Sequence, residues 1–435
     1  MIAGLRQQMS PEWMSSDVSL LMWARASMSV GRSLAGVIVP IYLAKNGFSS
    51  LELGALFAVV GIASAIMSAS TGLLAERFGR KPFIVAVPLL AAVAAIAYTM
   101  TTDVVLLFAF AALGSFGRGA GAGGGSVGPY QPAEQALVAD VTPAEHRNAV
   151  FGRLAFYSSL GALVGGLVAR IPDIASSLGF EGNAAYDPAF LAMAAVAVLA
   201  AALAVPVRDS SHGGEVRAPL IRFPRKSWPF LLKLWVTNSV NGVAVGFVGP
   251  FLTYWFYKRY GAGPGTIGLM YAFANLLGLF SNLGAASAAR GLGLVRAIVV
   301  GRTVQAGLLA VMVLMPTFWL ASVVYLVRIA GQRVAMPLRQ SYTLGMVPPE
   351  ERSAVAGLSN LPSQATSASG PPVAGYLFDH AGLTLPFEVA AMLYGVNTLL
   401  FYVFFRNMRP PEEAEEPVPA AAASAAPTPA ERGPT

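Results

Sequence analysis

The sequence predicts an all-α integral membrane protein whose twelve transmembrane helices form two pseudo-symmetric six-helix bundles. Three observations support this fold class. Of the 435 residues, 55% are hydrophobic and only 12% are charged, a balance that ordinary water-soluble domains do not have. Apolar stretches long enough to cross a bilayer recur along the chain, and one short segment appears twice, about half a chain apart.

The apolar stretches are predicted to be helices. Residues 59–75 and 189–207 are representative, and each approaches the ~20 residues that a spanning helix needs. The bilayer core leaves backbone groups without water, so only helices and closed barrels span it, and barrel strands would alternate polar and apolar residues. Twelve helical spans are expected to begin near Val18, Leu51, Phe83, Val104, Ala149, Pro188, Trp228, Thr266, Val295, Phe318, Ser353 and Phe387.

The repeated segment pairs TPAEHRNAVFG at residues 142–152 with VPPEERSAVAG at residues 347–357. The identities keep a constant offset of 205 residues, and Pro132 with Pro337 extends the register backward. A period of this length indicates a duplicated unit, because solenoids and propellers repeat about every 20–50 residues. Two halves in the same orientation imply a pseudo-two-fold axis along the membrane normal and a cavity between the halves.

Polar segments divide the chain. The longest internal one separates the sixth and seventh spans, and the end of the chain is rich in Pro, Ala and Glu, a composition typical of disorder. The predicted parts are a cytoplasmic N-terminus (1–17), an N-terminal six-helix bundle (18–207), a cytoplasmic linker (208–228), a C-terminal six-helix bundle (229–406) and a disordered cytoplasmic tail (407–435).

Lysine and arginine predict the orientation. With the N-terminus inside, the external segments carry only Lys45, Arg170, Lys258 and Arg259 of the 29 basic residues. This is the positive-inside pattern. We therefore expect a multi-pass protein of the cell (inner) membrane with both termini in the cytoplasm. The same bias explains most of the net charge of +7, so no nucleic-acid partner is expected.

The content of cysteine and histidine argues against catalysis. The chain has no cysteine, and its three histidines, His146, His212 and His380, fall in predicted loops. Disulfides, thiol nucleophiles and thiolate metal sites are thereby excluded. We expect no enzyme, no metal and no cofactor.

A charged loop, GLLAERFGRK at residues 72–81, follows the second predicted span. Its glycines allow close approach and tight turns, and its acid and basic residues form a charge cluster at the inner face. The chain here resembles the major facilitator superfamily, whose loop signature is Gly, three residues, Asp, Arg, one residue, Gly, Arg, and Arg or Lys. Glu76 replaces the Asp. The alternative interpretation is a generic positive-inside loop.

The resemblance implies a twelve-span secondary transporter with a conformational latch at this loop. Glu76 would face the positive N-terminal end of span eleven, the arginines would pair with an acid at the end of span four, and breaking the latch would release the outward-closed state. The predicted latch residues are Gly72, Glu76, Arg77, Gly79, Arg80 and Asp140.

Small residues in spans five and eleven form a second pattern. Their spacing resembles part of the antiporter motif of the same superfamily, with each half keeping a different part. Close helix packing explains the same residues equally well. The residues concerned are Gly152, Gly161, Gly165, Gly370, Pro371 and Gly375.

Arginines within the predicted spans are the strongest indication of a site. Arg32 and Arg328 lie near the bilayer centre in spans one and ten, and Arg118 lies deep in span four. Such residues are costly unless they face a partner, a wet cavity or a ligand, and every Asp and Glu falls in a loop or near a span end. The alternative is hydrogen bonding of the arginines to backbone carbonyls. Residues nearer the inner surface are expected to snorkel: Arg25, Lys233, Arg302 and Arg333.

The resemblance places spans one, four, seven and ten around the cavity, where these arginines would face substrate. Two asparagines on one face of span seven and a glutamine one turn after Arg328 add polar groups. The predicted substrate-binding residues are Arg32, Arg118, Asn238, Asn241, Arg328 and Gln332.

The sequence therefore predicts a secondary active transporter that moves a small solute by alternating access. We expect an exporter, with a cationic cavity that favours an anionic or acidic amphipathic substrate. One alternative is a proton-coupled multidrug efflux antiporter for neutral or cationic drugs, and another is a non-transporting membrane sensor or scaffold. Expected partners are the small-molecule substrate, the lipid bilayer, and protons or a counter-anion as coupling ion, and the chain is expected to be a monomer.

Overall fold

The first half of the chain folds into a bundle of helices. The computed structural model describes residues 15–116, 128–143, 146–209, 224–281, 294–351, 355 and 358–408, and it contains no strand within these ranges. The helices of the first half are α2 (Ser16–Lys45), α3 (Ser50–Phe78), α4 (Lys81–Met100), α5 (Val104–Gly114), α6 (Gln131–Val141), α7 (Arg147–Val168), α8 (Ile171–Ser177) and α9 (Asp187–Ala204).

The second half repeats this arrangement. Its helices are α10 (Trp228–Val248), α11 (Leu252–Tyr260), α12 (Pro264–Ser281), α14 (Leu294–Leu314), α15 (Phe318–Gly345), α17 (Leu361–Ser367), α18 (Gly370–Ala381) and α19 (Leu385–Phe405). A short 3₁₀ turn, η3 (Pro349–Glu351), lies between α15 and α17.

The helices group into twelve spans, as the sequence predicts. The fourth span consists of α5 and α6, the seventh of α10 continued by α11, and the eleventh of α17 and α18. Among the described residues, seven helical segments are long and apolar enough to cross a membrane, and three shorter apolar helices accompany them. The tenth span, α15, and the eleventh, α17 with α18, fall in neither group. Helix α15 is long enough, at 28 residues, but it carries Arg328, Arg333 and Arg339.

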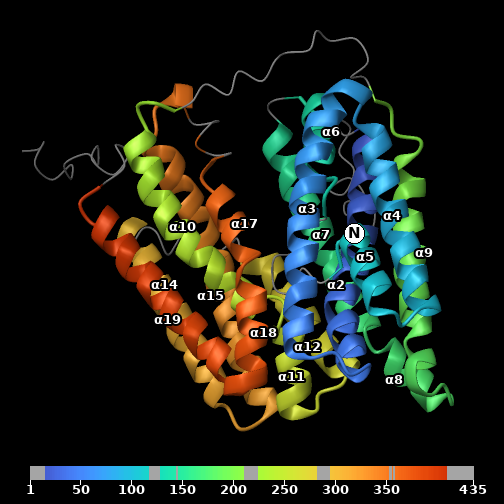
Figure 1. Cartoon of the computed structure of the whole chain (residues 1–435). Coiled ribbons are helices and arrows are strands. Elements are labelled where there is room, and N and C mark those ends of the chain that lie inside the picture. The colour runs from blue at the N-terminus through green and yellow to red at the C-terminus, as the bar shows by residue number, and fades with distance from the viewer. Residues whose placement is uncertain are drawn as a thin grey trace, which may run out of the picture.

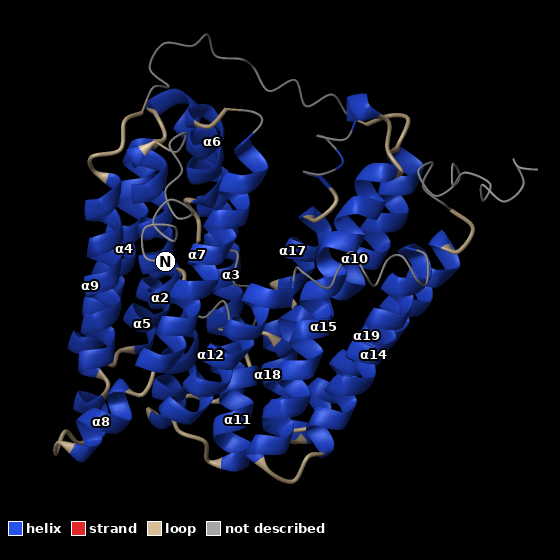
Figure 2. Ribbon diagram, turned by 180° about the vertical axis from the view of Figure 1, so that it is seen from behind, coloured by secondary structure: helices blue, strands red, loops and turns tan. Residues whose placement is uncertain are grey.

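Figure 1 shows the two groups of helices side by side, and Figure 2 shows the same arrangement from behind. Within the first group α2 packs against α7 and α9, and within the second α10 packs against α17 and α19. Two pairs, α3 with α18 and α7 with α12, make the most extensive contacts between the groups. We call the end where residues 209 and 224 lie the linker side, at the top of Figure 1, and the opposite end the distal side.

The two halves touch on the distal side and diverge toward the linker side. Along α3, a Cβ added to Gly54 would lie 2.4 Å from the carbonyl oxygen of Pro371, and one added to Gly61 would lie 3.5 Å from Ala368. Further along the same helix, Leu73 is 69% exposed and Phe78 is 57% exposed. The ribbons separate in this direction (Figures 1 and 2), so the described halves are closed distally and splayed at the linker side.

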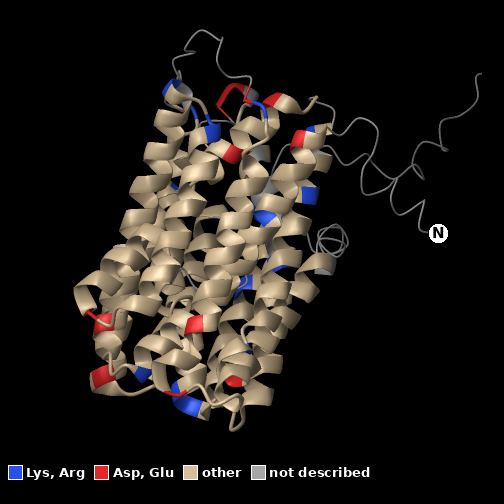
Figure 3. Cartoon of the chain, turned by 90° about the vertical axis from the view of Figure 1, so that its right-hand side faces the viewer, with Lys and Arg blue, Asp and Glu red and all other residues tan. Residues whose placement is uncertain are grey.

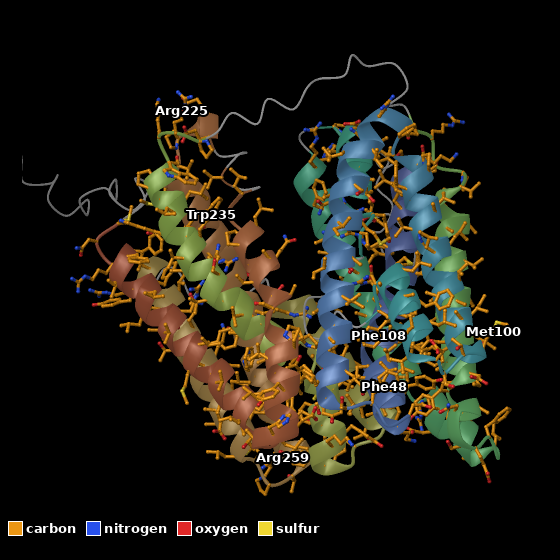
Figure 4. All side chains as sticks on the ribbon, in the orientation of Figure 1. Phe48, Met100, Phe108, Arg225, Trp235 and Arg259 are labelled. Atoms are coloured by element: carbon orange, nitrogen blue, oxygen red, sulfur yellow. The ribbon has the colours of Figure 1, made fainter. Side chains whose placement is uncertain are left out.

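The outer surface is apolar and its charges lie mainly at the two ends. Figure 3 shows most Lys, Arg, Asp and Glu residues near the ends of the helices, with few between. Figure 4 shows Met100 on the outside of the first bundle, where it is 81% exposed, whereas Phe48 is buried. Exposed Leu, Val and Ile side chains along the helices match the surface that lipid requires.

Glycines hold α7 directly against α2. A Cβ added to Gly161 would lie 2.1 Å from the carbonyl oxygen of Ala26, and one added to Gly165 would lie 2.4 Å from that of Val30. The hydroxyl of Ser33 donates to the carbonyl oxygen of Ala162 at 2.8 Å. Small residues at such crossings allow the backbones to approach within van der Waals contact.

A single methyl group at this contact is expected to destabilise the protein. Gly161→Ala should lower the free energy of unfolding by about 1–3 kcal/mol, because the new Cβ meets backbone that cannot move aside. The matched control is Gly152→Ala on the same helix, where nothing lies within 4 Å and better helix propensity should be neutral or stabilising by up to about 1 kcal/mol. Denaturation in mixed micelles measures both, and equal stability of the two variants would contradict the prediction.

Candidate functional site

A cavity of about 150 Å³ lies inside the second bundle, between α10, α14, α15 and α19. Three arginines, each from α14 or α15, line it together with amides, one tyrosine and one threonine. None of the described residues that line it is acidic. The lining residues are Asn241, Val245, Ile298, Arg302, Gln305, Arg328, Gln332, Arg339, Tyr394, Asn397 and Thr398.

Arg328 is the central cation of this cavity. The residue is 4% exposed, and its guanidinium carbon lies 5.4 Å from the centroid of the Tyr394 ring. Its Nε is buried without a hydrogen-bond partner among the described residues. A charged donor without an acceptor is costly in a protein interior. The Nε of Arg333 also lacks a partner among the described residues, but of the two arginines Arg328 alone lines the cavity, where a ligand could supply the acceptor.

A chain of hydrogen bonds positions Arg302, which lines the cavity from α14. Its Nη1 donates to Oδ1 of Asn397 at 3.3 Å, and Nδ2 of Asn397 donates to Oδ1 of Asn241 at 3.3 Å. The guanidinium carbon lies 4.7 Å from the ring centroid of Phe401, a cation–π distance. These contacts orient Arg302 but do not neutralise its charge.

The third arginine adds a like charge. Nη2 of Arg339 donates to Oδ1 of Asn360 at 3.1 Å, and Arg339 lies close enough to Arg302 for the two charges to repel each other. Gln305 and Gln332 contribute amides that can donate as well as accept. The cavity thus combines three positive charges with neutral hydrogen-bonding groups, an arrangement suited to binding an anion.

The structure brings together three of the predicted substrate-binding residues: Asn241, Arg328 and Gln332 all line the cavity. Asn238 does not. Its Nδ2 donates to the carbonyl oxygen of Ser359 at 2.6 Å, so it ties α10 to the start of span eleven.

Arg32 belongs to the other half and does not line this cavity. Its Nη1 lies 2.9 Å from the position of a Cβ on Gly128, and it is near enough to Tyr130 to interact with it electrostatically. Arg118 lies outside the described residues. Arg32 and Arg328 therefore do not line the same cavity in this conformation.

Two of the arginines predicted to snorkel have partners within the protein instead. Arg302 is half-buried, lines the cavity and donates to Asn397, and Arg25 is 4% exposed and paired with Glu134. Snorkelling requires a side chain that extends to the membrane surface, whereas these two side chains contact polar groups of their own bundles. Sequence position gave the depth of these residues along their helices but not the direction in which each side chain points.

Glu134 is a buried acidic partner that the sequence analysis did not assign to Arg25. It lies in α6, is 1% exposed and accepts from Nε of Arg25 at 3.0 Å and from Nη2 at 2.5 Å. Tyr130, also buried, adjoins the pair. The first bundle therefore neutralises its buried arginine, in contrast to the second.

The predicted loop latch is partly described. Arg80 and Asp140 form an ion pair, and Gly79 ends α3 with a positive φ of 86°. Arg77 is exposed at the end of α3, and Gly72 lies on that helix with Pro132 of its own half beside it. The side chain of Glu76 lies outside the described residues. The latch therefore stays a prediction.

The predicted small-residue positions lie mostly at helix contacts. Gly370 approaches Gly246 and Pro371 approaches Gly54, while a Cβ on Gly375 would lie 2.3 Å from the carbonyl oxygen of Ser50. Gly161 and Gly165 contact α2, as described above, and Gly152 has open space around it.

The sequence matches the family model described as Major Facilitator Superfamily over residues 21–361 and 234–434. The quinolone resistance protein NorA of Staphylococcus aureus is 22% identical over 410 residues, which cover 89% of this chain and 96% of NorA. An uncharacterized membrane protein of Saccharomyces cerevisiae, YJR124C, is 19% identical over 428 residues, covering 90% and 94% of the two chains.

Solved structures share the fold at low identity. A bacterial homolog of the human lysosomal transporter Spinster, in an inward-facing and unoccupied conformation, superposes with a TM-score of 0.71 and 12% identity, covering 91% of this chain and 98% of that one. A D-xylose–proton symporter superposes with a TM-score of 0.67 and 15% identity, covering 89% and 97%.

Proposed function

This chain belongs to the major facilitator superfamily, and we propose that it carries a small anionic solute across the membrane by alternating access, with the arginine cavity as its binding site. It is a transporter rather than an enzyme, since the family and the structural neighbours are transporters. One observation above all supports an anionic substrate. Three arginines line the cavity without an acid among its described lining residues, and the Nε of Arg328 lacks an acceptor.

The same charges favour a substrate with more than one negative charge. A monoanion would leave two of the three guanidinium groups without a counter-charge in a medium of low dielectric constant, where like charges repel strongly. A dianion can bridge two of the three guanidinium groups across the cavity. The neutral amides of Asn241, Gln305 and Gln332 then hydrogen-bond to its remaining polar atoms.

A series of ligands with one carbon skeleton tests this charge preference. Binding of succinate, monomethyl succinate and succinamide to the purified protein should weaken in that order, by about tenfold for each charge removed, or about 1.4 kcal/mol. Sulfate, a compact dianion, should compete with succinate for the site. If succinamide binds as tightly as succinate, or if sulfate does not compete, the anion proposal fails.

The direction of transport and the orientation of the chain in the membrane are part of the same proposal. The linker side is taken as cytoplasmic, with both termini there, because the positive-inside pattern of the sequence favours it. The halves of residues 18–207 and 229–406 would then rock about the site as a monomer in the cell membrane. Export is favoured by the similarity to NorA, whose name refers to quinolone resistance, and the splayed linker side corresponds to an inward-facing state.

A second candidate function rests on a different observation, the buried pair of Arg25 and Glu134. A buried carboxylate that gains and loses a proton would couple transport to a pH gradient, as in a proton-coupled efflux antiporter of neutral or cationic drugs. Transport of a cationic dye that releases protons, and that Glu134→Gln abolishes, would favour this candidate. Dye transport that is absent in the unaltered protein would exclude it.

A further inference from the structure

Aspartate carboxylates join the two halves on the distal side at the N-termini of helices. The first is Asp379 of α18. Its Oδ1 accepts from the backbone N–H of Ser50 at 3.0 Å, and its Oδ2 accepts from that of Leu51 at 2.9 Å. Both donors are the first residues of α3, where backbone N–H groups lack partners within the helix and the dipole favours a negative charge.

The second carboxylate makes the same kind of contact, but its acid belongs to the first half and the helix N-terminus belongs to the second. Asp173 of α8, in the first half, accepts from the backbone N–H of Gly265 at the start of α12 with its Oδ2 at 2.8 Å. Each half thus offers one acid and one helix N-terminus to the other. The two acids are related by the internal repeat, since Asp379 lies one residue from the position that the 205-residue offset assigns to Asp173.

Close contacts at glycines bring the helices of the two halves together beside both acids. A Cβ on Gly375 would lie 2.3 Å from the carbonyl oxygen of Ser50, beside Asp379, and one on Gly268 would lie 2.3 Å from that of Gly166, two turns from Asp173. A Cβ on Gly265 itself would lie 2.5 Å from Oδ2 of Asp173. The helices approach closely enough for a short Asp side chain to reach the facing N-terminus.

The linker side uses the same chemistry within single halves. Oδ2 of Asp209 accepts from the backbone N–H groups of Arg80 and Lys81 at the start of α4, and Glu351 of η3 accepts from those of Lys226 and Ser227 before α10. Hydrogen bonding from Ser227 lowers the pKa of the Glu351 carboxyl. Because these contacts join elements of one half, they do not restrain the halves from separating.

We propose that Asp173 and Asp379 are the gating residues of the distal side, a pair of matched latches that hold the inward-facing state closed there. Opening the distal side breaks both contacts and exposes the donors to water, which satisfies them. Helix α3 need not unwind, because Ser49 and Glu52 already form a capping box at its start. The latches therefore add a reversible bias toward the inward-facing state, independently of the substrate.

The predicted loop latch would be the counterpart at the other end of the same helix pair. There the resemblance implies that Glu76, at the end of α3, faces the N-terminus of span eleven. At the distal end Asp379 of span eleven contacts the N-terminus of α3. Each helix would then offer an acid to the start of the other, and the two ends would close alternately.

Distance measurements between the halves test the distal latches without a substrate. Because the chain has no cysteine, Leu74→Cys on α3 and Leu361→Cys on α17, both exposed on the linker side, can be spin-labelled directly in the full-length protein. The double variant Asp173→Ala and Asp379→Ala should shift the population from the long distance of the inward-facing state to a shorter one. The ratio should change by about tenfold for each acid and about a hundredfold for both.

The matched control is Glu351→Ala, which removes the same kind of contact within one half and should leave the distance distribution unchanged. Should the double variant fail to fold, Asp379→Asn keeps an acceptor oxygen without the charge and should give a smaller shift in the same direction. A folded double variant with the distribution of the unaltered protein would overturn the proposal, and so would an equal shift in Glu351→Ala.

Discussion

Glu134→Ala is expected to lower the free energy of unfolding by about 3–5 kcal/mol, because it leaves the charge of Arg25 buried and unpaired. Arg25 is 4% exposed. Its guanidinium donates three hydrogen bonds to the carboxylate of Glu134. Denaturation of the purified protein in mixed micelles measures the loss.

A double variant separates the cost of the unpaired charge from the value of the pair. Arg25→Met with Glu134→Leu removes both charges and should recover most of the stability, since apolar residues often replace a buried ion pair at little cost. Asp140→Ala is the exposed control and should change stability by about 1 kcal/mol or less. If the double variant is no more stable than Glu134→Ala, the loss has another cause than the unpaired arginine.

The buried pair also has a functional implication. Apolar residues of similar volume often stabilise a core as well as a buried ion pair does, so the second candidate function proposed above would give the pair a role besides stability. It lies beside Tyr130, which is also close to Arg32. Tyr130 therefore lies near both the ion pair and Arg32.

The sequence was sufficient to predict the spans and their grouping. Bilayer thickness and apolar length define where a helix begins and ends, and the predicted starts at Val104, Trp228 and Phe318 coincide with those of α5, α10 and α15. The 205-residue repeat indicated two related halves. These are properties of local composition, and a single sequence contains them in full.

The partners of the buried charges were harder to predict. The depth of Arg302 along its span follows from counting residues, but the direction of its side chain depends on how α14 is rotated against α15 and α19. Glu134 was counted among the acids near a span end, and its pairing with Arg25, 109 residues away in the chain, was not predicted. The span continues as α6. Contacts between helices far apart in the chain are set by tertiary packing, which periodicity alone does not encode.

The two halves share a fold but differ in whether an acidic side chain neutralises their inward-facing arginines. In the first half, the positive charge of Arg25 is matched by Glu134. In the second, Arg302, Arg328 and Arg339 surround a cavity without an acid among its described lining residues. An unmatched charge costs stability, so the second half is expected to retain it only where a ligand provides the counter-charge during transport.

Arg328→Met should therefore weaken the binding of succinate by at least about 30-fold, or about 2 kcal/mol, while leaving the empty protein as stable as before or more stable. The two effects follow from one fact. Arg328 has a buried Nε without an acceptor among the described residues, so methionine removes an unsatisfied charge from the empty cavity and an essential partner from the occupied one. Isothermal titration and denaturation in mixed micelles measure the two quantities.

The matched control is Arg333→Met on the same helix. Arg333 shares with Arg328 a buried Nε without an acceptor among the described residues. It donates to Oδ1 of Asn275 at 3.0 Å and does not line the cavity, so its replacement should leave succinate binding unchanged. A purely structural role of Arg328 predicts the opposite pattern, with stability lost and binding kept once the protein is folded. Measurements of stability and binding together therefore decide whether Arg328 stabilises the fold or binds the substrate.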